Sequence, residues 1–313
     1  MKTSLNKKNL LSLNDLCKEE IVSVLELSKD LKEDLKNGKS SQLLKGRTLA
    51  MIFQKPSTRT RLSFERGIVQ LGGTAIYLNS NDLQLARGES IEDTARTLSL
   101  YVDLIMARVY AHSDIEKLAE YSSVPVINGL SDTFHPCQIL ADLLTIQEQK
   151  NTLNGLKVAW IGDGNNVCND LILGCSKIGV SVSIACPPGF EPNENVQNIA
   201  RQEASKSSSE ITITDDPLKA VQNADVLATD TFISIGKDEE SQRREEIFLP
   251  KYQVNSNLLR SAKPDCIFMH CLPASRGREV TSEVIDGKAS VVWDQAENRL
   301  HVQKALMCML PLR

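Results

Sequence analysis

The sequence has no long apolar run and no excess of basic side chains, and each absence excludes a class of protein. No stretch approaches the about 18 apolar residues of a membrane-spanning helix, and residues 1–8 lack an apolar signal segment. The 36 basic and 40 acidic side chains give a net charge of -4, which disfavours a general binder of nucleic acid or anionic membranes. We therefore expect a cytoplasmic protein that binds any anion with a local cluster of cations.

Metal-binding residue types are also scarce. The chain has four histidines, and its eight cysteines are scattered without a Cys-x-x-Cys pair. This distribution is typical of reduced thiols rather than of a disulfide framework or a zinc site, so no metal is expected. Aromatic residues make up only 4%, but 41% of the residues are hydrophobic, which is enough for a sizeable core.

The length of 313 residues favours two domains, although one large domain is possible. Short apolar runs alternate with amphipathic helical patterns, which is typical of parallel α/β sheets. Strands are predicted at 48–53, 75–78, 104–107 and 124–127, and, after a turn at 151–155, at 156–161, 180–185, 211–214, 226–229, 266–270 and 290–293. We expect two domains, residues 1–150 and 151–295, linked by a helix over 135–150.

Helix ends are predicted from capping residues and apolar faces. Asn14 and Asp15 are expected to cap the first helix, and a last helix is expected over 296–310. Residues 237–251 are too polar for a core. They predict a solvated loop or helix face, or a mobile lid because of their length.

A phosphate site is predicted where the strand 48–53 gives way to a helix. Residues 57–61 read Ser-Thr-Arg-Thr-Arg, and a helix N-terminus attracts anions through its free N–H groups and its dipole. The hydroxyl groups add donors, and Arg59 offers a planar fork that matches phosphate oxygens. The alternative is an ordinary hydroxyl cap with two surface arginines, but two cations in a first turn oppose the dipole unless an anion compensates them.

Four further segments carry polar groups at predicted strand or helix ends. His135 and Gln138 lie one helical turn apart and can both donate to a carbonyl oxygen, although a histidine at a helix start is often structural. Residues 162–166 follow a strand like a dinucleotide loop, but Val167 replaces the third glycine, and a tight turn with an Asn cap explains them equally well. Asp230, just past another strand, can bind an ammonium group. Cys271 also follows a strand, where a buried cysteine is usually a small hydrophobe.

Taken together and in this order, these motifs resemble the aspartate and ornithine carbamoyltransferase family over essentially the whole chain. The family shares Ser-Thr-Arg-Thr-Arg (57–61) and His-Pro-x-Gln (135–138). The run 270–273 and the loop 230–236 look like its ornithine branch, since the aspartate branch has a proline in place of Cys271. The resemblance implies two doubly wound parallel-sheet domains, with the C-terminal helix, 296–313, packing back on the N-terminal domain.

The resemblance implies a reaction in arginine metabolism without a cofactor. The carbamoyl group of carbamoyl phosphate would pass to the δ-amino group of L-ornithine, giving L-citrulline and phosphate, in a homotrimer with sites at subunit interfaces. Arg59, Arg108 and His135 would stabilise charge on the carbamoyl oxygen and the leaving phosphate. The amine proton would go to the phosphate or to Cys271, coupled to Asp230, with no covalent cysteine intermediate.

Each matched residue then has an implied role. The phosphate would be held by Ser57, Thr58, Arg59, Thr60 and Arg108. The carbamoyl group would be surrounded by His135, Gln138 and Arg299. Ornithine would be bound by Asn166, Asp230, Ser234 and Ile235. Cys271 and the Leu272 backbone would meet the reacting groups, and Gln84 would reach into a neighbouring subunit's site.

One departure from the family leaves the acceptor open. Ile235 stands where the family usually has methionine, so acceptors such as N-acetylornithine, succinylated ornithine or putrescine stay possible. A Rossmann-type dehydrogenase would explain the alternating pattern but leaves the arginine cluster unused. A non-enzymatic metabolite sensor is the remaining alternative.

Overall fold

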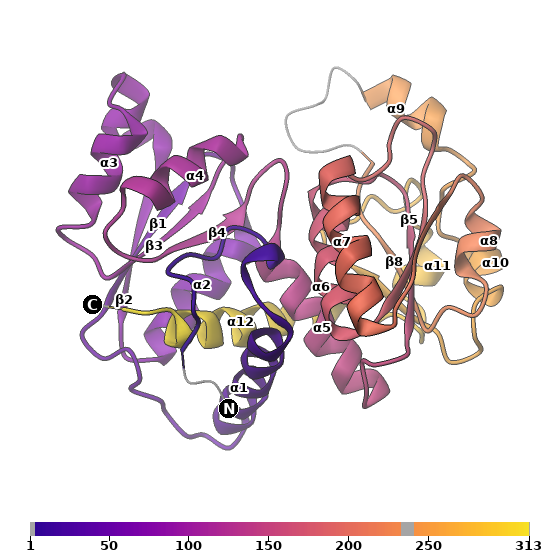
Figure 1. The fold of residues 1–313 in the computed structure, drawn as a ribbon, viewed down its shortest axis with the longest axis horizontal. Helices are drawn as coiled ribbons and strands as arrows, with labels where there is room; N and C mark the ends of the chain where they lie inside the picture. The colour runs from indigo at the N-terminus through magenta and orange to yellow at the C-terminus, as the bar shows by residue number, and fades with distance from the viewer. Residues whose placement is uncertain (1–3, 233–240, 313) are drawn as a thin grey trace. The chain divides into compact units, whose positions relative to one another are not determined.

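A computed structural model describes residues 4–232 and 241–312, which divide into two compact units. Unit 1 comprises Met1–Leu144 and Glu297–Arg313, and unit 2 comprises Thr145–Ala296. Two helices, α5 (Pro136–Lys150) and α12 (Val292–Met309), continue from one unit into the other (Figure 1). Within the described ranges, no helix is both long and apolar enough to cross a membrane.

Unit 1 contains a four-stranded parallel sheet in the order β2-β1-β3-β4. Its strands are β1 (Thr48–Phe53), β2 (Thr74–Asn79), β3 (Leu104–Arg108) and β4 (Val126–Leu130). Its helices are α1 (Lys18–Lys36), α2 (Thr58–Gln70), α3 (Ile91–Leu98) and α4 (His112–Tyr121), with short 3-10 turns η1 (Leu13–Asp15), η2 (Ser80–Asp82) and η3 (Gln84–Arg87). The inner strands are fully buried because helices cover both faces, which is why they read as continuous apolar runs.

Unit 2 contains a five-stranded parallel sheet in the order β7-β6-β5-β8-β9. Its strands are β5 (Lys157–Ile161), β6 (Ser181–Ala185), β7 (Ile211–Thr214), β8 (Val226–Thr229) and β9 (Ile267–His270). Its helices are α6 (Asn166–Ile178), α7 (Glu194–Ser207), α8 (Pro217–Val221), α9 (Ser241–Phe248), α10 (Ser256–Arg260) and α11 (Ser282–Ile285). α6 and α7 lie on one side of the sheet, and α8, α10 and α11 lie on the other (Figure 1). Two parallel sheets covered by helices confirm the predicted α/β class.

The C-terminal helix packs against unit 1, as predicted. A Cβ atom built on Gly67 of α2 would lie 3.2 Å from Met307 Cε and 3.3 Å from Lys304 Cγ, so glycine allows α2 and α12 to approach closely. Lys304 Nζ also donates to the carbonyl oxygen of Leu31 in α1, at 3.3 Å. Figure 1 shows α12, in yellow, running beside α2 and α1.

One predicted strand and one predicted helix start were wrong. The strand expected over 290–293 does not form, because Ser290 makes only an isolated bridge to Phe268 and α12 already begins at Val292. The first helix begins at Lys18 rather than next to Asn14 and Asp15. Asp15 instead accepts hydrogen bonds from the N–H groups of Leu11 and Ser12 and closes the separate turn η1. Local capping chemistry was recognised there but assigned to the wrong turn.

Candidate active site

Both sheets have a topological switch point, where ligands of open α/β sheets usually bind. In unit 1 the chain winds outward in one direction from β1 to β2 and in the other from β3 to β4, so the switch lies between β1 and β3. In unit 2 it lies between β5 and β8. The segments that follow these four strands contain most of the residues that the sequence singles out. Each unit therefore has a candidate site at its own switch point.

The N-terminus of α2 forms the first part of the unit 1 site. Ser57 is the N-cap in an extended conformation, and its Oγ accepts a hydrogen bond from Thr60 N at 3.3 Å. The exposed Thr58 and the half-buried Arg59 occupy the first turn, where N–H groups and the positive end of the dipole favour an anion. Arg61 instead contacts Glu65 at 3.4 Å and stacks 3.8 Å over the ring of Tyr77. This geometry gives Arg61 a supporting role.

A buried polar cluster lies behind this helix start. Arg299 of α12 donates from Nη1 to Gln138 Oε1 at 2.6 Å and from Nη2 to Thr60 Oγ1 at 3.1 Å. Gln138 in turn donates from Nε2 to Asp142 Oδ1 at 2.8 Å. An amide nitrogen carries two protons, so Gln138 keeps a second N–H bond for another acceptor. Arg299 thus fixes the orientation of both the hydroxyl and the amide.

A buried arginine and a buried histidine complete the unit 1 site. Arg108, the last residue of β3, and His135, which directly precedes α5, are both at least nine-tenths buried. Burial lowers the pKa of His135 well below its ordinary value, and the Arg299 and Arg108 guanidinium groups lower it further. The imidazole is therefore neutral near pH 7 and can donate one N–H bond. Two guanidinium groups beside a neutral imidazole favour an anionic ligand.

Gln84 lies apart from this cluster in the sequence and on the surface. It is the first residue of η3, and its side chain is exposed. Its predicted role in a neighbouring subunit's site stays a prediction.

Asp230 is the centre of the unit 2 site. It follows β8, is 9% exposed, and accepts hydrogen bonds from Cys271 Sγ at 2.9 Å and from Asn165 Nδ2 at 2.8 Å. The Thr231 N–H also donates to it at 2.8 Å. The structure thus brings the predicted residues Asp230 and Cys271 into direct contact. Asn165, which caps α6, was not predicted as a site residue, whereas the predicted Asn166 is the first residue of that helix.

The turn after β9 holds Cys271 in place. His270 Nδ1 accepts the Leu272 N–H at 2.9 Å, and its Nε2 lies 3.2 Å from Glu279 Oε1 in a fully buried pair. Leu272 adopts a positive φ of 57°, which is strained for a leucine and which this backbone hydrogen bond supports. Atoms of Asp230, His270 and Cys271 that could ligate a metal ion lie within 4.8 Å of one another. All three residues already take part in the hydrogen bonds described above. The expectation of no metal stays a prediction.

The loop after β5 has glycines for packing reasons. A Cβ on Gly164 would lie 2.2 Å from Pro192 N, and Gly162 has a φ of 129° with the Phe232 ring 3.0 Å from its Cβ position. The chain's own segments therefore account for both glycines without a bound dinucleotide. This removes the main support for a dehydrogenase.

Arg244 is the residue that sequence reasoning missed most clearly. It lies in the polar segment read as a solvated loop or helix face, yet its side chain is buried in α9. It donates to the Phe232 carbonyl oxygen and pairs with Asp163, while its guanidinium lies over the rings of Phe190 and Phe248. It thereby joins the loop after β5 to the loop after β8. The predicted residues Ser234 and Ile235 lie outside the described residues.

Comparison with known proteins identifies the family of both units. Residues 8–148 match the model "Aspartate/ornithine carbamoyltransferase, carbamoyl-P binding domain", and residues 154–310 match "Aspartate/ornithine carbamoyltransferase, Asp/Orn binding domain". The chain is 56% identical to the ornithine carbamoyltransferase of Carboxydothermus hydrogenoformans over 99% of both chains. It is 56% identical to the anabolic enzyme of Pyrococcus furiosus over 99% of this chain and 98% of that one. A solved structure of ornithine carbamoyltransferase from Pyrococcus furiosus superposes with a TM-score of 0.95 at 56% identity, covering 98% of each chain.

Proposed function

Because the chain belongs to the aspartate/ornithine carbamoyltransferase family, we propose that it transfers the carbamoyl group of carbamoyl phosphate to the δ-amino group of L-ornithine. The products are L-citrulline and phosphate. Relatives named anabolic, from Pyrococcus furiosus and Campylobacter jejuni, support the synthetic direction and a place in arginine biosynthesis. The observation that carries the proposal is the buried set of Arg108, His135, Gln138 and Arg299 beside the N-terminus of α2.

The proposed carbamoyl-phosphate-binding domain is residues 1–150 with the returning helix 296–313, and it nearly coincides with unit 1. Ser57, Thr58, Arg59, Thr60 and Arg108 hold the phosphate. The neutral His135 imidazole donates an N–H bond to the carbamoyl oxygen, and the second N–H of Gln138 does the same. These donors are fixed before the substrate arrives, so they stabilise the charge that develops on this oxygen without reorganising.

The proposed ornithine-binding domain is residues 151–295, and it nearly coincides with unit 2. The Asp230 carboxylate and Asn166, together with Ser234 and Ile235, hold ornithine, and Asp230 also accepts a hydrogen bond from the Cys271 thiol. An ammonium group cannot attack, so the δ-ammonium first loses one proton to an acceptor near Asp230 and Cys271. The turn at Leu272 directs Cys271 and the Leu272 backbone toward the reacting groups.

The bond changes follow from these positions. The δ-nitrogen lone pair forms a bond to the carbamoyl carbon, and the carbon–oxygen bond to phosphate breaks with its electron pair on the phosphate oxygen. Arg59, Arg108 and the N-terminus of α2 neutralise that developing charge. The second proton of the attacking nitrogen passes to the leaving phosphate or, through Cys271, to Asp230. No cofactor takes part, so full activity in the presence of a chelator is expected.

We also propose that the active form is a homotrimer in which Gln84 completes the site of a neighbouring subunit. Exposed apolar side chains of unit 1 support burial against another copy, since large exposed apolar groups mark contact surfaces. They are Leu62, Ile76, Leu100 and Tyr101, which are 60%, 42%, 78% and 74% exposed. Sedimentation at micromolar concentration should give three times the mass of one chain. A monomer with full activity would contradict the shared site. The cytoplasmic location stays a prediction.

An acceptor comparison tests the proposed function. Ureido-product formation from carbamoyl phosphate is measured with L-ornithine, N-acetylornithine, putrescine and aspartate in parallel. Ornithine should react at least tenfold faster in kcat/KM than any other acceptor. A preference for N-acetylornithine or putrescine would reassign the acceptor, and no product with any of them would contradict the transferase itself.

A further inference from the structure

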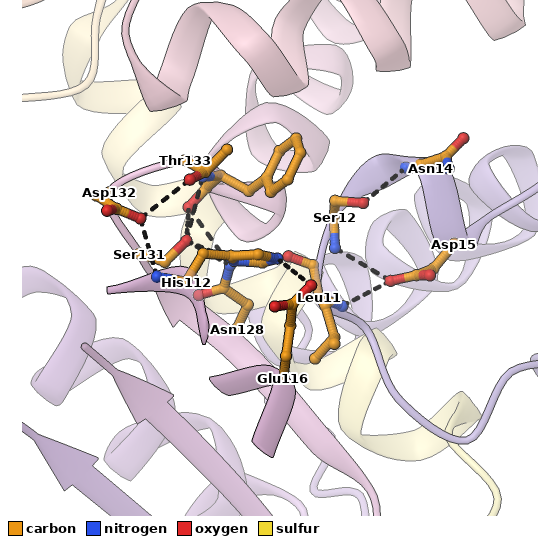
Figure 2. Close-up of polar contacts among 11 residues, drawn as sticks. Leu11, Ser12, Asn14, Asp15, His112, Glu116, Asn128, Ser131, Asp132 and Thr133 are labelled. Carbon is orange, nitrogen blue, oxygen red and sulfur yellow. Dashed lines mark hydrogen bonds and ion pairs between the residues drawn. The ribbon is translucent and has the colours of Figure 1, made fainter. Parts of the chain in front are cut away.

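His112 packs against the loop that leads to His135. Its ring lies at the start of α4, where Nδ1 is 2.9 Å from Ser131 Oγ and the ring centroid is 4.9 Å from that of Phe134, at an edge-on angle of 69°. Its backbone N–H donates to Asp132 Oδ1 at 2.9 Å. One residue of α4 therefore contacts three of the four residues that precede His135. Figure 2 shows the hydrogen bonds of His112 with Ser131 and Asp132.

The loop itself is a closed turn, which the Asp132 N–H also ties to the Tyr110 carbonyl oxygen at 3.2 Å. Ser131 N donates to the Phe134 carbonyl oxygen at 3.0 Å, and Phe134 N donates to Ser131 Oγ at 3.2 Å. Asn128 at the end of β4 donates from Nδ2 to the Leu11 carbonyl oxygen at 2.8 Å, which ties the base of the turn to the N-terminal segment. Ser131 Oγ is thus the shared atom of the turn, and His112 is hydrogen-bonded to it.

Burial and the neighbouring carboxylates together favour one tautomer of the His112 ring. Burial lowers the pKa of His112, while Glu116 from the same helix, Asp132 from the loop and Asp15 from η1 oppose this effect. Burial favours the neutral ring, and Glu116 Oε1, 3.9 Å from Nε2, favours the tautomer of that ring with its proton on Nε2. Nδ1 then accepts the Ser131 hydroxyl proton, and the same oxygen accepts the Phe134 N–H. The Phe134 N–H, the Ser131 hydroxyl and His112 Nδ1 then form one short hydrogen-bonded chain.

The position of His135 depends on this turn. Its carbonyl oxygen accepts the first bonds of α5, from Gln138 N at 3.1 Å and Ile139 N at 3.4 Å, so the helix fixes the residue on one side. On the other side the chain joins it directly to Phe134, so a shift of the turn carries over to its backbone. A displaced turn would move the imidazole relative to the two guanidinium groups of the unit 1 site.

We propose that His112 is a positioning residue of the carbamoyl phosphate site, which acts by holding the Ser131–Phe134 turn and through it the imidazole of His135. The inference rests on the proposed function for its catalytic meaning, but the position of His135 can be measured without turnover. His112 touches no substrate in this account.

The test combines two substitutions that each remove the same hydrogen bond. His112→Phe keeps a ring against Phe134 and loses the bond to Ser131, and Ser131→Ala loses the bond from the other side. Each should lower kcat/KM for carbamoyl phosphate by about fivefold to tenfold, the equivalent of one net hydrogen bond, and the double variant should lose no more than either single one. His112→Asn, whose Oδ1 can take the place of Nδ1, should recover most of the loss. Glu120→Gln, an exposed position of the same helix, is the matched control.

A second readout follows His135 directly. The chain contains four histidines, so the ring signals in a 15N-histidine-labelled protein are few, and a His135→Asn sample assigns the line of interest. His112→Phe and Ser131→Ala should shift or broaden the His135 signals and leave those of His270 and His301 in place. Unchanged His135 signals in both variants, or equal changes at all remaining histidines, would overturn the inference. If wild-type protein makes no citrulline, the proposed function fails while this readout still decides the role of His112. If His112→Phe does not fold, Ser131→Ala and His112→Asn decide it.

Discussion

Replacing Arg299 with lysine tests how the carbamoyl phosphate site is held together. Arg299 is 3% exposed and uses two nitrogens for two acceptors, Gln138 Oε1 at 2.6 Å and Thr60 Oγ1 at 3.1 Å. Lysine keeps the charge but has a single nitrogen on a shorter reach, so at most one of these bonds survives. A hydrogen bond from a charged donor contributes about 1.5–3 kcal/mol, which corresponds to a loss of about tenfold to 150-fold.

The assay is kcat/KM for carbamoyl phosphate at saturating ornithine. Arg299→Lys should lose activity within that range, because a rotated Gln138 amide no longer aims its second N–H at the carbamoyl oxygen. Arg299→Met should lose more, since both acceptors are left buried without a donor, and it should also raise the pKa of His135 by removing one of the two neighbouring cations. The matched control is Arg96→Lys, at an exposed position of α3, which should leave kcat/KM unchanged. Activity of Arg299→Lys within twofold of wild type would refute this description of the site.

Further predictions concern the acceptor site, the protonation state of His135 and the ion pair between Arg244 and Asp163. Cys271→Ala should lower ornithine turnover at least tenfold and leave binary binding of carbamoyl phosphate unchanged; an unchanged rate would make the thiol structural. The pKa of His135 in the folded protein lies below its unfolded value of about 6.5, so as the pH is lowered the unfolded chain binds a proton before the folded one does. In phosphate-free buffer the free energy of unfolding should therefore decrease by up to about 1.4 kcal/mol for each pH unit below 6.5. His135→Gln should flatten that slope, and an identical slope would contradict the assignment. Arg244→Met should lower the free energy of unfolding by about 3 kcal/mol, because it leaves the Asp163 carboxylate partly buried without its cation, whereas Arg243→Met should change it little in urea unfolding.

The sequence predicted those features that depend on neighbouring residues along the chain. Apolar runs over 48–53 and 104–107 became β1 and β3, and the hydroxyl residue before Thr58 became the N-cap of α2. Parallel strands then bring their carboxyl ends to one edge, so the position of Arg108 beside the start of α2 follows from the sheet order.

Contacts between distant segments could not be predicted in this way. Nothing in the local pattern around Arg244 shows that its charge is balanced by Asp163, so the segment read as solvated. Asn165 and Asn166 are equally plausible as caps, and only the position of Asp230 decides which of the two reaches it. The strand expected at 290–293 failed for a similar reason, since a short apolar run fits a buried helix start as well as a strand.

The most direct test of the central claim is the fate of the carbamoyl carbon. The protein is incubated with 13C-carbamoyl phosphate and ornithine labelled with 15N at the δ-nitrogen, and the product is observed by 13C NMR. Transfer to the δ-amino group should give a ureido carbon signal that is split by one-bond coupling to 15N, together with release of one phosphate per citrulline. An unsplit ureido signal, or phosphate release without a ureido product, would contradict transfer to the δ-amino group.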